Sequence, residues 1–237
     1  MTHFTRRSFV ASAAAGIGAT GILGSATTAA AGQLVWAASD WKIADFSKLV
    51  AHPARVKQVY DVTRIDEGKF LNNIKNSLNG LRFGFSIPED QIKVVAALHG
   101  PANFLNYDDT VWKKYQIGEW LKVTDPATGR PAEKNIFFPK GATAAGKSAE
   151  DPQNEHSSLQ GKSIQELQAR GVQFLSCHTA IEEQARVIVR QQNLPVAPEA
   201  VVQDMLAHTL SGVLVVASMV AALALLQSEG HYSYITV

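Results

Sequence analysis

The chain has 237 residues, of which 22 are lysine or arginine and 21 are aspartate or glutamate. This length allows one domain or at most two small ones, and the balanced charge provides no basic surface for nucleic acid. The single cysteine, Cys177, excludes an intramolecular disulfide and a cysteine-rich metal site.

The first thirty or so residues have the features of a twin-arginine export signal. Arg6 and Arg7 precede an uncharged run rich in alanine and glycine, Ala11–Ala31, whose last residues suit a signal peptidase. We therefore predict a signal peptide at residues 1–31, passage through the twin-arginine (Tat) translocon and residence in the periplasm. The alternative is that the run is retained as a membrane anchor, which its composition disfavours because alanine and glycine partition poorly into hydrocarbon.

After the signal, the apolar residues predict strands that alternate with helices. Gln33–Pro53 predicts an arm or a short helix, and Val56–Val62 predicts a strand rich in β-branched residues. Ile92–Leu98 is a continuous apolar run, typical of a strand that is covered on both faces. Between these strands, a helix is predicted to end at Gly80 and to bury one face, formed by Phe70, Leu71, Ile74 and Leu78.

Residues 106–157 are polar and contain several prolines and glycines, so we predict an insertion. We expect it to be partly ordered by its aromatic residues, Trp112, Tyr115, Trp120, Phe137 and Phe138. Within it, Gly141–Ser148 matches the phosphate-binding pattern GxxxxGKS. That motif needs a buried strand before it and a helix after it, and the sequence predicts neither, so we assign the match to chance.

Two helices in the second half begin with the sequence pattern of a capping box. Ser163–Glu166 predicts a helix that stops at Gly171, and Thr179–Glu182 predicts the start of another. Between them, Val172–Ser176 predicts a strand that ends at Cys177.

The C-terminal residues predict two further helices, each followed by a strand. The helices are expected at Glu199–Leu210 and Val220–Glu229, and the strands at Val213–Met219 and Tyr232–Val237. Met205–Gln227 carries no formal charge, which raises the alternative of a transmembrane span. The strand-like VLVV run and several polar residues favour the reading as separate elements.

This alternation predicts a single α/β domain at residues 32–237. Because crossovers between neighbouring parallel strands are right-handed, we expect a doubly wound, mainly parallel sheet of about five strands with helices on both faces. In such sheets, ligands bind beyond the carboxyl ends of the strands, where loops meet the N-termini of helices.

Cys177 falls at this edge of the predicted sheet, just before a predicted helix. Free backbone N–H groups and the positive end of that helix would favour the thiolate, which is the nucleophilic form of cysteine. Glu182 and Glu183 would oppose this effect, and a protonated His178 would support it. The alternative, that Cys177 is a small buried residue closing a strand, stays open.

His99 ends the preceding strand and is expected at the same edge, where it could act as a base or as a hydrogen-bond donor to sulfur. A histidine at the end of a strand can also be purely structural. Together, His99, Cys177 and His178 could hold a soft metal, but their spacing matches no established ligand set, so we predict neither a metal nor a cofactor.

Three segments of the chain resemble the DsrE/DsrF-like proteins of sulfur metabolism. They are GVQFLSCHTAI at Gly171–Ile181, IKVVAALHG upstream of it, and LALLQSEGHYSYI at Leu223–Ile235. The resemblance extends over residues 55–108 and 161–237. The export signal and the insertion at residues 106–157 depart from the family's pattern. Both weigh against the family's sulfur-relay role, because the cytoplasmic partners of that relay would be absent from the periplasm.

The resemblance implies a five-stranded α/β sandwich, homo-oligomers and, at the position of Cys177, a cysteine that carries sulfur as a persulfide. Our leading hypothesis is a periplasmic sulfur carrier or sulfurtransferase, in which Cys177 accepts sulfur from a donor protein and passes it to an acceptor. His99 and His178 would be supporting groups. The second hypothesis is a noncatalytic ligand-binding or assembly module with a buried, unreactive Cys177, and the third is a metal-binding protein.

Overall fold

The computed structural model describes residues 41–139 and 151–237. The predicted signal peptide and the GxxxxGKS match therefore lie outside the described residues. The described residues form a five-stranded, all-parallel sheet in the order β4-β3-β2-β1-β5. Its strands are β1 (Val56–Val62), β2 (Ile92–Leu98), β3 (Gln173–Cys177), β4 (Leu214–Val216) and β5 (Ser233–Thr236). The predicted doubly wound α/β fold is confirmed.

Helices pack on both faces of this sheet. They are α1 (Ile43–Val50), α2 (Lys69–Asn79), α3 (Asp109–Lys114), α4 (Ile117–Trp120), α5 (Ile164–Ala169), α6 (His178–Gln191), α7 (Pro198–Ala207) and α8 (Met219–Ser228). A 3-10 helix, η4 (Gly100–Asn106), follows β2. No helix in the described ranges is long and apolar enough to span a membrane.

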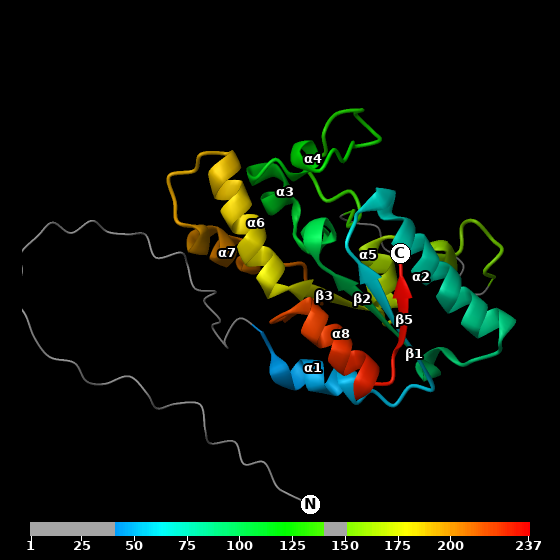
Figure 1. The fold of residues 1–237 in the computed structure, drawn as a ribbon. Helices are drawn as coiled ribbons and strands as arrows, with labels where there is room; N and C mark the ends of the chain where they lie inside the picture. Colours follow the sequence, from blue (N-terminus) through cyan, green and yellow to red (C-terminus); the bar gives the residue numbers. More distant parts are fainter. Residues whose placement is uncertain (1–40, 140–150) are drawn as a thin grey trace, which may run out of the picture. The chain divides into compact units, whose positions relative to one another are not determined.

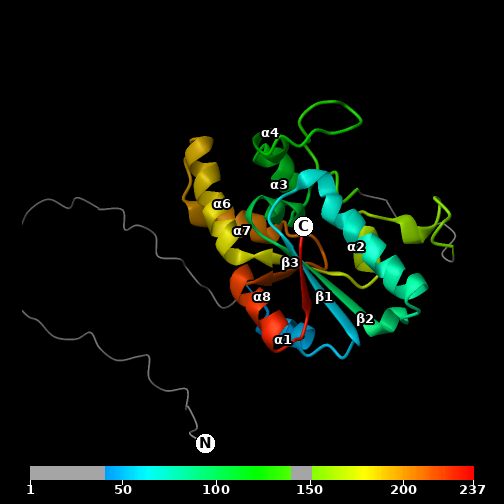
Figure 2. The same ribbon diagram turned by 45° about the vertical axis from the view of Figure 1, so that its right-hand side comes forward.

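The strand order explains which face each helix covers. From β1 to β4, the chain steps across the sheet in one direction, and α8 then carries it back to β5 at the opposite edge. Because right-handed crossovers in opposite directions use opposite faces, α8 lies on the face opposite α2 and α5. Figures 1 and 2 show α8 beside α1 on that second face.

The change of direction occurs at β3 and β4. The helix after β3, α6, packs mainly on the first face, whereas the helix after β4, α8, packs on the second. Two adjacent strands whose connections leave toward opposite faces define a topological switch point, where open α/β sheets bind ligands. In this chain the switch point lies at the carboxyl ends of β3 and β4.

Each face of the sheet has its own buried core. Side chains alternate along a strand, so Phe174 points into the larger core and Leu175 into the smaller one. The smaller core is formed with α1 and α8 and includes Leu49, Val59, Cys177, Leu223 and Leu226. Burying an aliphatic side chain stabilises a fold by about 1.5–3 kcal/mol, so these contacts anchor both helices.

The end of α2 agrees with the sequence prediction, whereas the extent of β4 does not. Helix α2 ends at Asn79, next to the predicted stop, but Gly80 has right-handed helical angles and the chain continues through a π-helical turn, Gly80–Gly84. Gly80 is therefore not a left-handed helix terminator. Strand β4 has three residues instead of the predicted Val213–Met219, since α8 already begins at Met219.

The described part of the predicted insertion packs against the larger core. Trp112 and Tyr115 are buried, and the indole Nε1 of Trp112 donates a hydrogen bond to Phe104 O at 3.0 Å. The side-chain amide of Asn135 donates to Leu105 O at 2.9 Å and to Tyr107 O at 2.8 Å. The expected ordering by aromatic residues is therefore present, reinforced by a buried asparagine.

Candidate functional site

Cys177 lies at the switch point, between the first turns of two helices. It is the last residue of β3 and the N-cap of α6, and Val216 at the end of β4 is its partner in the sheet. Its Sγ accepts a hydrogen bond from the backbone N–H of Met219, the first residue of α8, at 3.3 Å. The sulfur is thus the point at which β3, β4, α6 and α8 meet.

Burial dominates the acid–base behaviour of this thiol. Cys177 is 5% exposed, and burial raises the pKa of its thiol above the ordinary value. Backbone N–H groups of Ala180, Met219 and Thr179 act in the opposite direction, while the negative charge of Glu183 adds a small further rise in the pKa. The helix amides therefore act as expected from the sequence, but the loss of hydration outweighs them.

The predicted capping box at Thr179–Glu182 is wrong. Helix α6 begins at His178 because β3 runs directly into it, which places Thr179 inside the first turn. The hydroxyl of Thr179 donates to Ala217 O at 3.0 Å, and its backbone N–H donates to the same carbonyl at 3.2 Å. Thr179 therefore joins the start of α6 to the end of β4.

His178 is the first residue of α6. Its Nδ1 lies 3.3 Å from Oε1 of Glu182, one helical turn later, and its ring packs edge-on to Trp41 with 5.4 Å between the ring centroids. Glu182 also lies 3.5 Å from Nη2 of Arg186. These contacts of His178 lie along α6 and with Trp41.

His99 lies at the same edge of the sheet as Cys177. Leu98 and Ser176 are sheet partners, so His99 and Cys177 are the next residues on neighbouring strands. Both are two residues beyond members of the smaller core, Ala97 and Leu175, and so share one face of the sheet. Within the described residues, no hydrogen bond joins the imidazole to Sγ.

The partner of His99 is a carboxylate that sequence reasoning missed. Nε2 of His99 lies 2.7 Å from Oδ1 of Asp61 in β1, and the hydroxyl of Tyr234 in β5 donates to the other carboxylate oxygen. The side chains of His99 and Asp61 are 22% and 14% exposed, so this part of the edge reaches solvent. With Nε2 donating to Asp61, Nδ1 is left as a proton acceptor. In the sequence, this contact could have been suspected from Asp61, an acidic residue among apolar ones at the end of the predicted strand.

A buried amide network, also missed by sequence reasoning, fixes the backbone at Cys177. Oδ1 of Asn103, on η4, accepts hydrogen bonds from the backbone N–H of Cys177 and from Oγ of Ser176, both at 3.0 Å. Its Nδ2 donates to the hydroxyl of Tyr107 at 3.0 Å and to Oε1 of Gln184 at 3.3 Å. Such a fully buried network rigidifies its surroundings, so the cysteine backbone is held in place from the β2 side.

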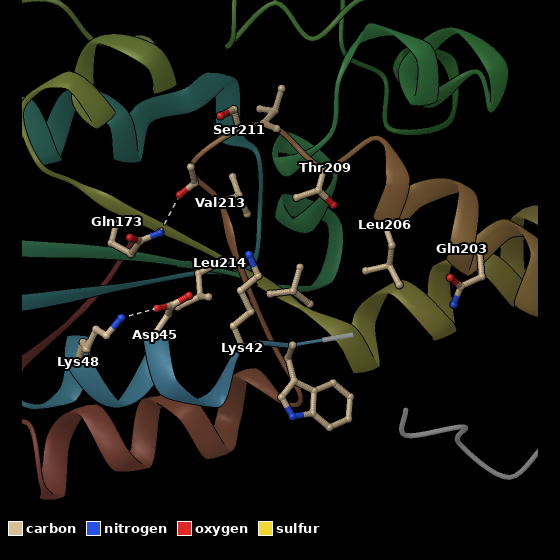
Figure 3. Close-up of a pocket in the computed structure, with 14 residues that line it drawn as sticks. Lys42, Asp45, Lys48, Gln173, Gln203, Leu206, Thr209, Ser211, Val213 and Leu214 are labelled. Carbon is tan, nitrogen blue, oxygen red and sulfur yellow. Dashed lines mark hydrogen bonds and ion pairs between the residues drawn. The ribbon is translucent and has the colours of Figure 1, made fainter. Parts of the chain in front are cut away.

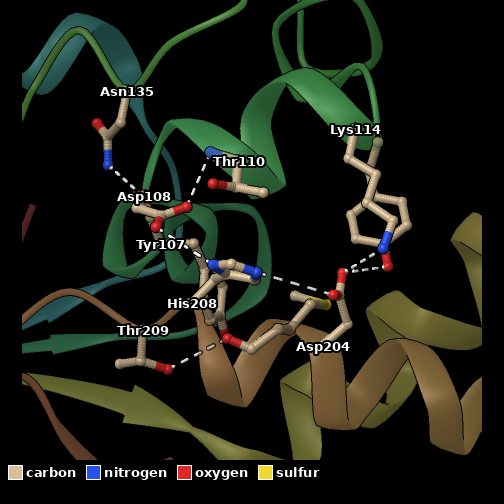
Figure 4. A network of polar contacts seen from close by, with 10 residues as sticks. Tyr107, Asp108, Thr110, Lys114, Asn135, Asp204, His208 and Thr209 are labelled. Carbon is tan, nitrogen blue, oxygen red and sulfur yellow. Dashed lines mark hydrogen bonds and ion pairs between the residues drawn. The ribbon is translucent and has the colours of Figure 1, made fainter.

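A second polar cluster joins α3 to α7, away from the switch point (Figure 4). The carboxylate of Asp204 accepts hydrogen bonds from the Tyr115 hydroxyl at 2.6 Å and from Nζ of Lys114 at 2.9 Å. His208 lies between Asp108, at 3.3 Å, and Asp204, at 3.9 Å. Within the described residues, no group of three or more His, Cys, Asp or Glu side chains could hold a metal ion, so the metal hypothesis gains no support.

The fold and the site together define an open α/β protein with one thiol at its switch point. Comparison with family models and with curated proteins finds no match. Among solved structures, the chain is similar to a protein of unknown function, MTH1491 from Methanobacterium thermoautotrophicum, with 15% identity and a TM-score of 0.38. The alignment covers 77% of this chain and 99% of that one. This similarity assigns neither a family nor a function.

Proposed function

We propose that the protein is a sulfur carrier in which Cys177 accepts sulfane sulfur as a persulfide and passes it to an acceptor. The observation that carries this proposal is the hydrogen bond from Met219 N–H to Sγ, at the point where two helices begin. Backbone N–H groups at helix N-termini stabilise negative charge, here on a thiolate or on a persulfide.

The transfer step balances without an external oxidant. The Cys177 thiolate attacks the outer sulfur of a donor persulfide, R–S–SH, so that a new S–S bond forms as the donor's S–S bond breaks. The leaving thiolate, R–S⁻, takes up the proton that Cys177 released. His99 is the neighbouring group that can hold this proton, because its contact with Asp61 leaves Nδ1 free to accept it.

Burial sets a condition on this chemistry. At 5% exposure and with a raised pKa, the resting thiol is protonated and shielded. A donor therefore reaches the sulfur only when the smaller core opens locally beside it, and the same burial slows the reaction of the thiol with unrelated oxidants and alkylating agents. We also propose the periplasm as the location, a homo-oligomer as the working form, and a donor and an acceptor protein as partners.

The test is the mass of the intact protein after incubation with polysulfide as sulfane donor. We expect a gain of one sulfur atom, located at Cys177 by peptide mapping, no gain in Cys177→Ala, and a loading rate at least tenfold lower in His99→Gln. The proposal fails if native protein gains no sulfur while urea-unfolded protein is labelled at the same residue.

The second candidate is a noncatalytic ligand-binding module. The burial of Cys177 and the raised pKa of its thiol favour it, since a structural cysteine needs neither access nor ionisation. It predicts that Cys177→Ala keeps every binding property of the native protein, and that polysulfide leaves the native mass unchanged.

A further inference from the structure

Two cavities meet at the start of α1, on the outer side of the edge strand β4. The larger, of about 730 Å³, lies beside β4 and the loop that precedes it (Figure 3). The smaller, of about 180 Å³, lies between α1 and α8. Trp41, Lys42 and Val215 line both cavities, so the two spaces adjoin at these three residues.

The smaller cavity suits an apolar group of limited size. Its lining is aliphatic and aromatic except for Ser218 and Lys42, and includes Ile43, Phe46, Val216, Ala222 and Leu225. An apolar cavity of about 150 Å³ is known to hold benzene, so a space of about 180 Å³ accommodates a single six-membered ring.

The charged side chains that line the larger cavity are Lys42, Lys48 and Asp45, which together carry one net positive charge. Nζ of Lys48 lies 2.9 Å from Oδ1 of Asp45, so these two charges neutralise each other. Lys42 is the other charged residue in the lining. The pKa of Asp45 is lowered mainly by its hydrogen-bonded ion pair with Lys48, and the charge of Lys42 helps to lower it further. Figure 3 shows the Lys48–Asp45 pair with Lys42 beside it. The junction therefore carries a net positive charge where the apolar cavity opens.

We propose that this junction binds a small arylalkyl carboxylate, with its ring in the smaller cavity and its carboxylate at Nζ of Lys42. An apolar space with one convergent charged group is the usual form of a small-molecule site, since burial gives affinity and the charge fixes the orientation. The remaining space of the larger cavity admits water or substituents on the acid. This inference does not depend on sulfur transfer.

The experiment is a calorimetric titration of the full-length protein with 3-phenylpropionate, its amide and 3-phenylpropylamine. We expect saturable binding of the acid, at least tenfold weaker binding of the amide and no detectable binding of the amine. Lys42→Gln should weaken acid binding about tenfold, to the level of the amide. Ala221→Phe should abolish binding of both, because Ala221 lines the smaller cavity from the exposed side of α8.

Two controls separate this site from other effects. Lys113→Gln removes an exposed lysine of α3 and should leave acid binding unchanged, as should Cys177→Ala. Circular dichroism melting should show that Ala221→Phe is folded. Equal binding of acid and amine, unchanged affinity in Lys42→Gln, or no saturation by any of the three probes would overturn the inference. Binding seen only in a dimer formed at high protein concentration would overturn it too.

Discussion

Cys177 and Asp204 are both partly or fully buried acidic groups with hydrogen-bond donors around them, yet their pKa values move in opposite directions. Burial raises the pKa of the Cys177 thiol, and the amides that surround it do not compensate. Burial also acts to raise the pKa of Asp204, but hydrogen bonds from Tyr115 and Lys114 outweigh it and lower the pKa.

The difference lies in the donors and in the depth of burial. Asp204 keeps 23% of its side chain exposed and receives a hydroxyl at 2.6 Å and an ammonium group at 2.9 Å. Cys177 receives a backbone N–H at 3.3 Å and is 5% exposed. Charge-assisted hydrogen bonds are about twice as strong as neutral ones, and sulfur is a weak acceptor. Amides alone therefore do not ionise a buried thiol.

The largest effect is expected from removing the amide that holds the cysteine backbone. Asn103→Ala deprives Cys177 N–H, Ser176 Oγ and Gln184 Oε1 of a buried partner. We expect the free energy of unfolding to fall by about 3 kcal/mol in urea titrations at pH 7. Asn73→Ala, at an exposed site on α2, is the matched control and should stay within about 0.5 kcal/mol of the native protein. A similar small loss in Asn103→Ala would contradict the structural role of the network.

The second-largest effect on the free energy of unfolding is expected at Asp204. The pKa of Asp204 is lowered in the folded state. The ionised carboxylate therefore stabilises the fold above its unfolded pKa of about 3.9, and this stabilisation is lost as the pH falls through the folded pKa. Asp204→Asn should therefore cost about 2 kcal/mol at pH 7 and much less at pH 2. Urea titrations at both pH values measure this, with Asp90→Asn as an exposed control. An equal loss at both pH values would show that ionisation of Asp204 does not stabilise the fold.

The sheet and the placement of Cys177 at its carboxyl edge were predictable, because runs such as Ile92–Leu98 are apolar enough to identify buried strands. The contacts that govern the site were not. Asp61, Tyr234 and Asn103 come from elements far apart in the chain, and only the strand order brings them to one edge. The direction in which the pKa of the thiol shifts also could not be predicted from the sequence, since it depends on how deeply α8 and α1 bury Cys177.

A smaller effect concerns the thiol itself. The raised pKa of Cys177 means that folding disfavours the thiolate. The stability that the protonated thiol contributes is therefore present below its unfolded pKa of about 8.5, and it is lost as the pH rises through the folded pKa. Relative to Cys177→Ala, the native protein should lose at most about 1.4 kcal/mol of unfolding free energy by pH 9.5. Alkylation by iodoacetamide should have its midpoint at a higher pH in native than in urea-unfolded protein. A native midpoint at or below the unfolded one would reverse the comparison with Asp204.

The smallest effect isolates one charge at the thiol. Glu183 lies in the first turns of α6, and its carboxylate adds to the raised pKa of Cys177. Glu183→Gln removes this repulsion while leaving the helix amides in place, so the rate of alkylation at pH 8 should rise by a factor of about two. The gain should shrink at high salt, because the carboxylate is partly screened by solvent ions. Glu199→Gln, at the start of α7, is the control and should leave the rate unchanged. If Glu183→Gln accelerated alkylation many-fold, charge and not burial would govern the thiol, and the contrast with Asp204 would disappear.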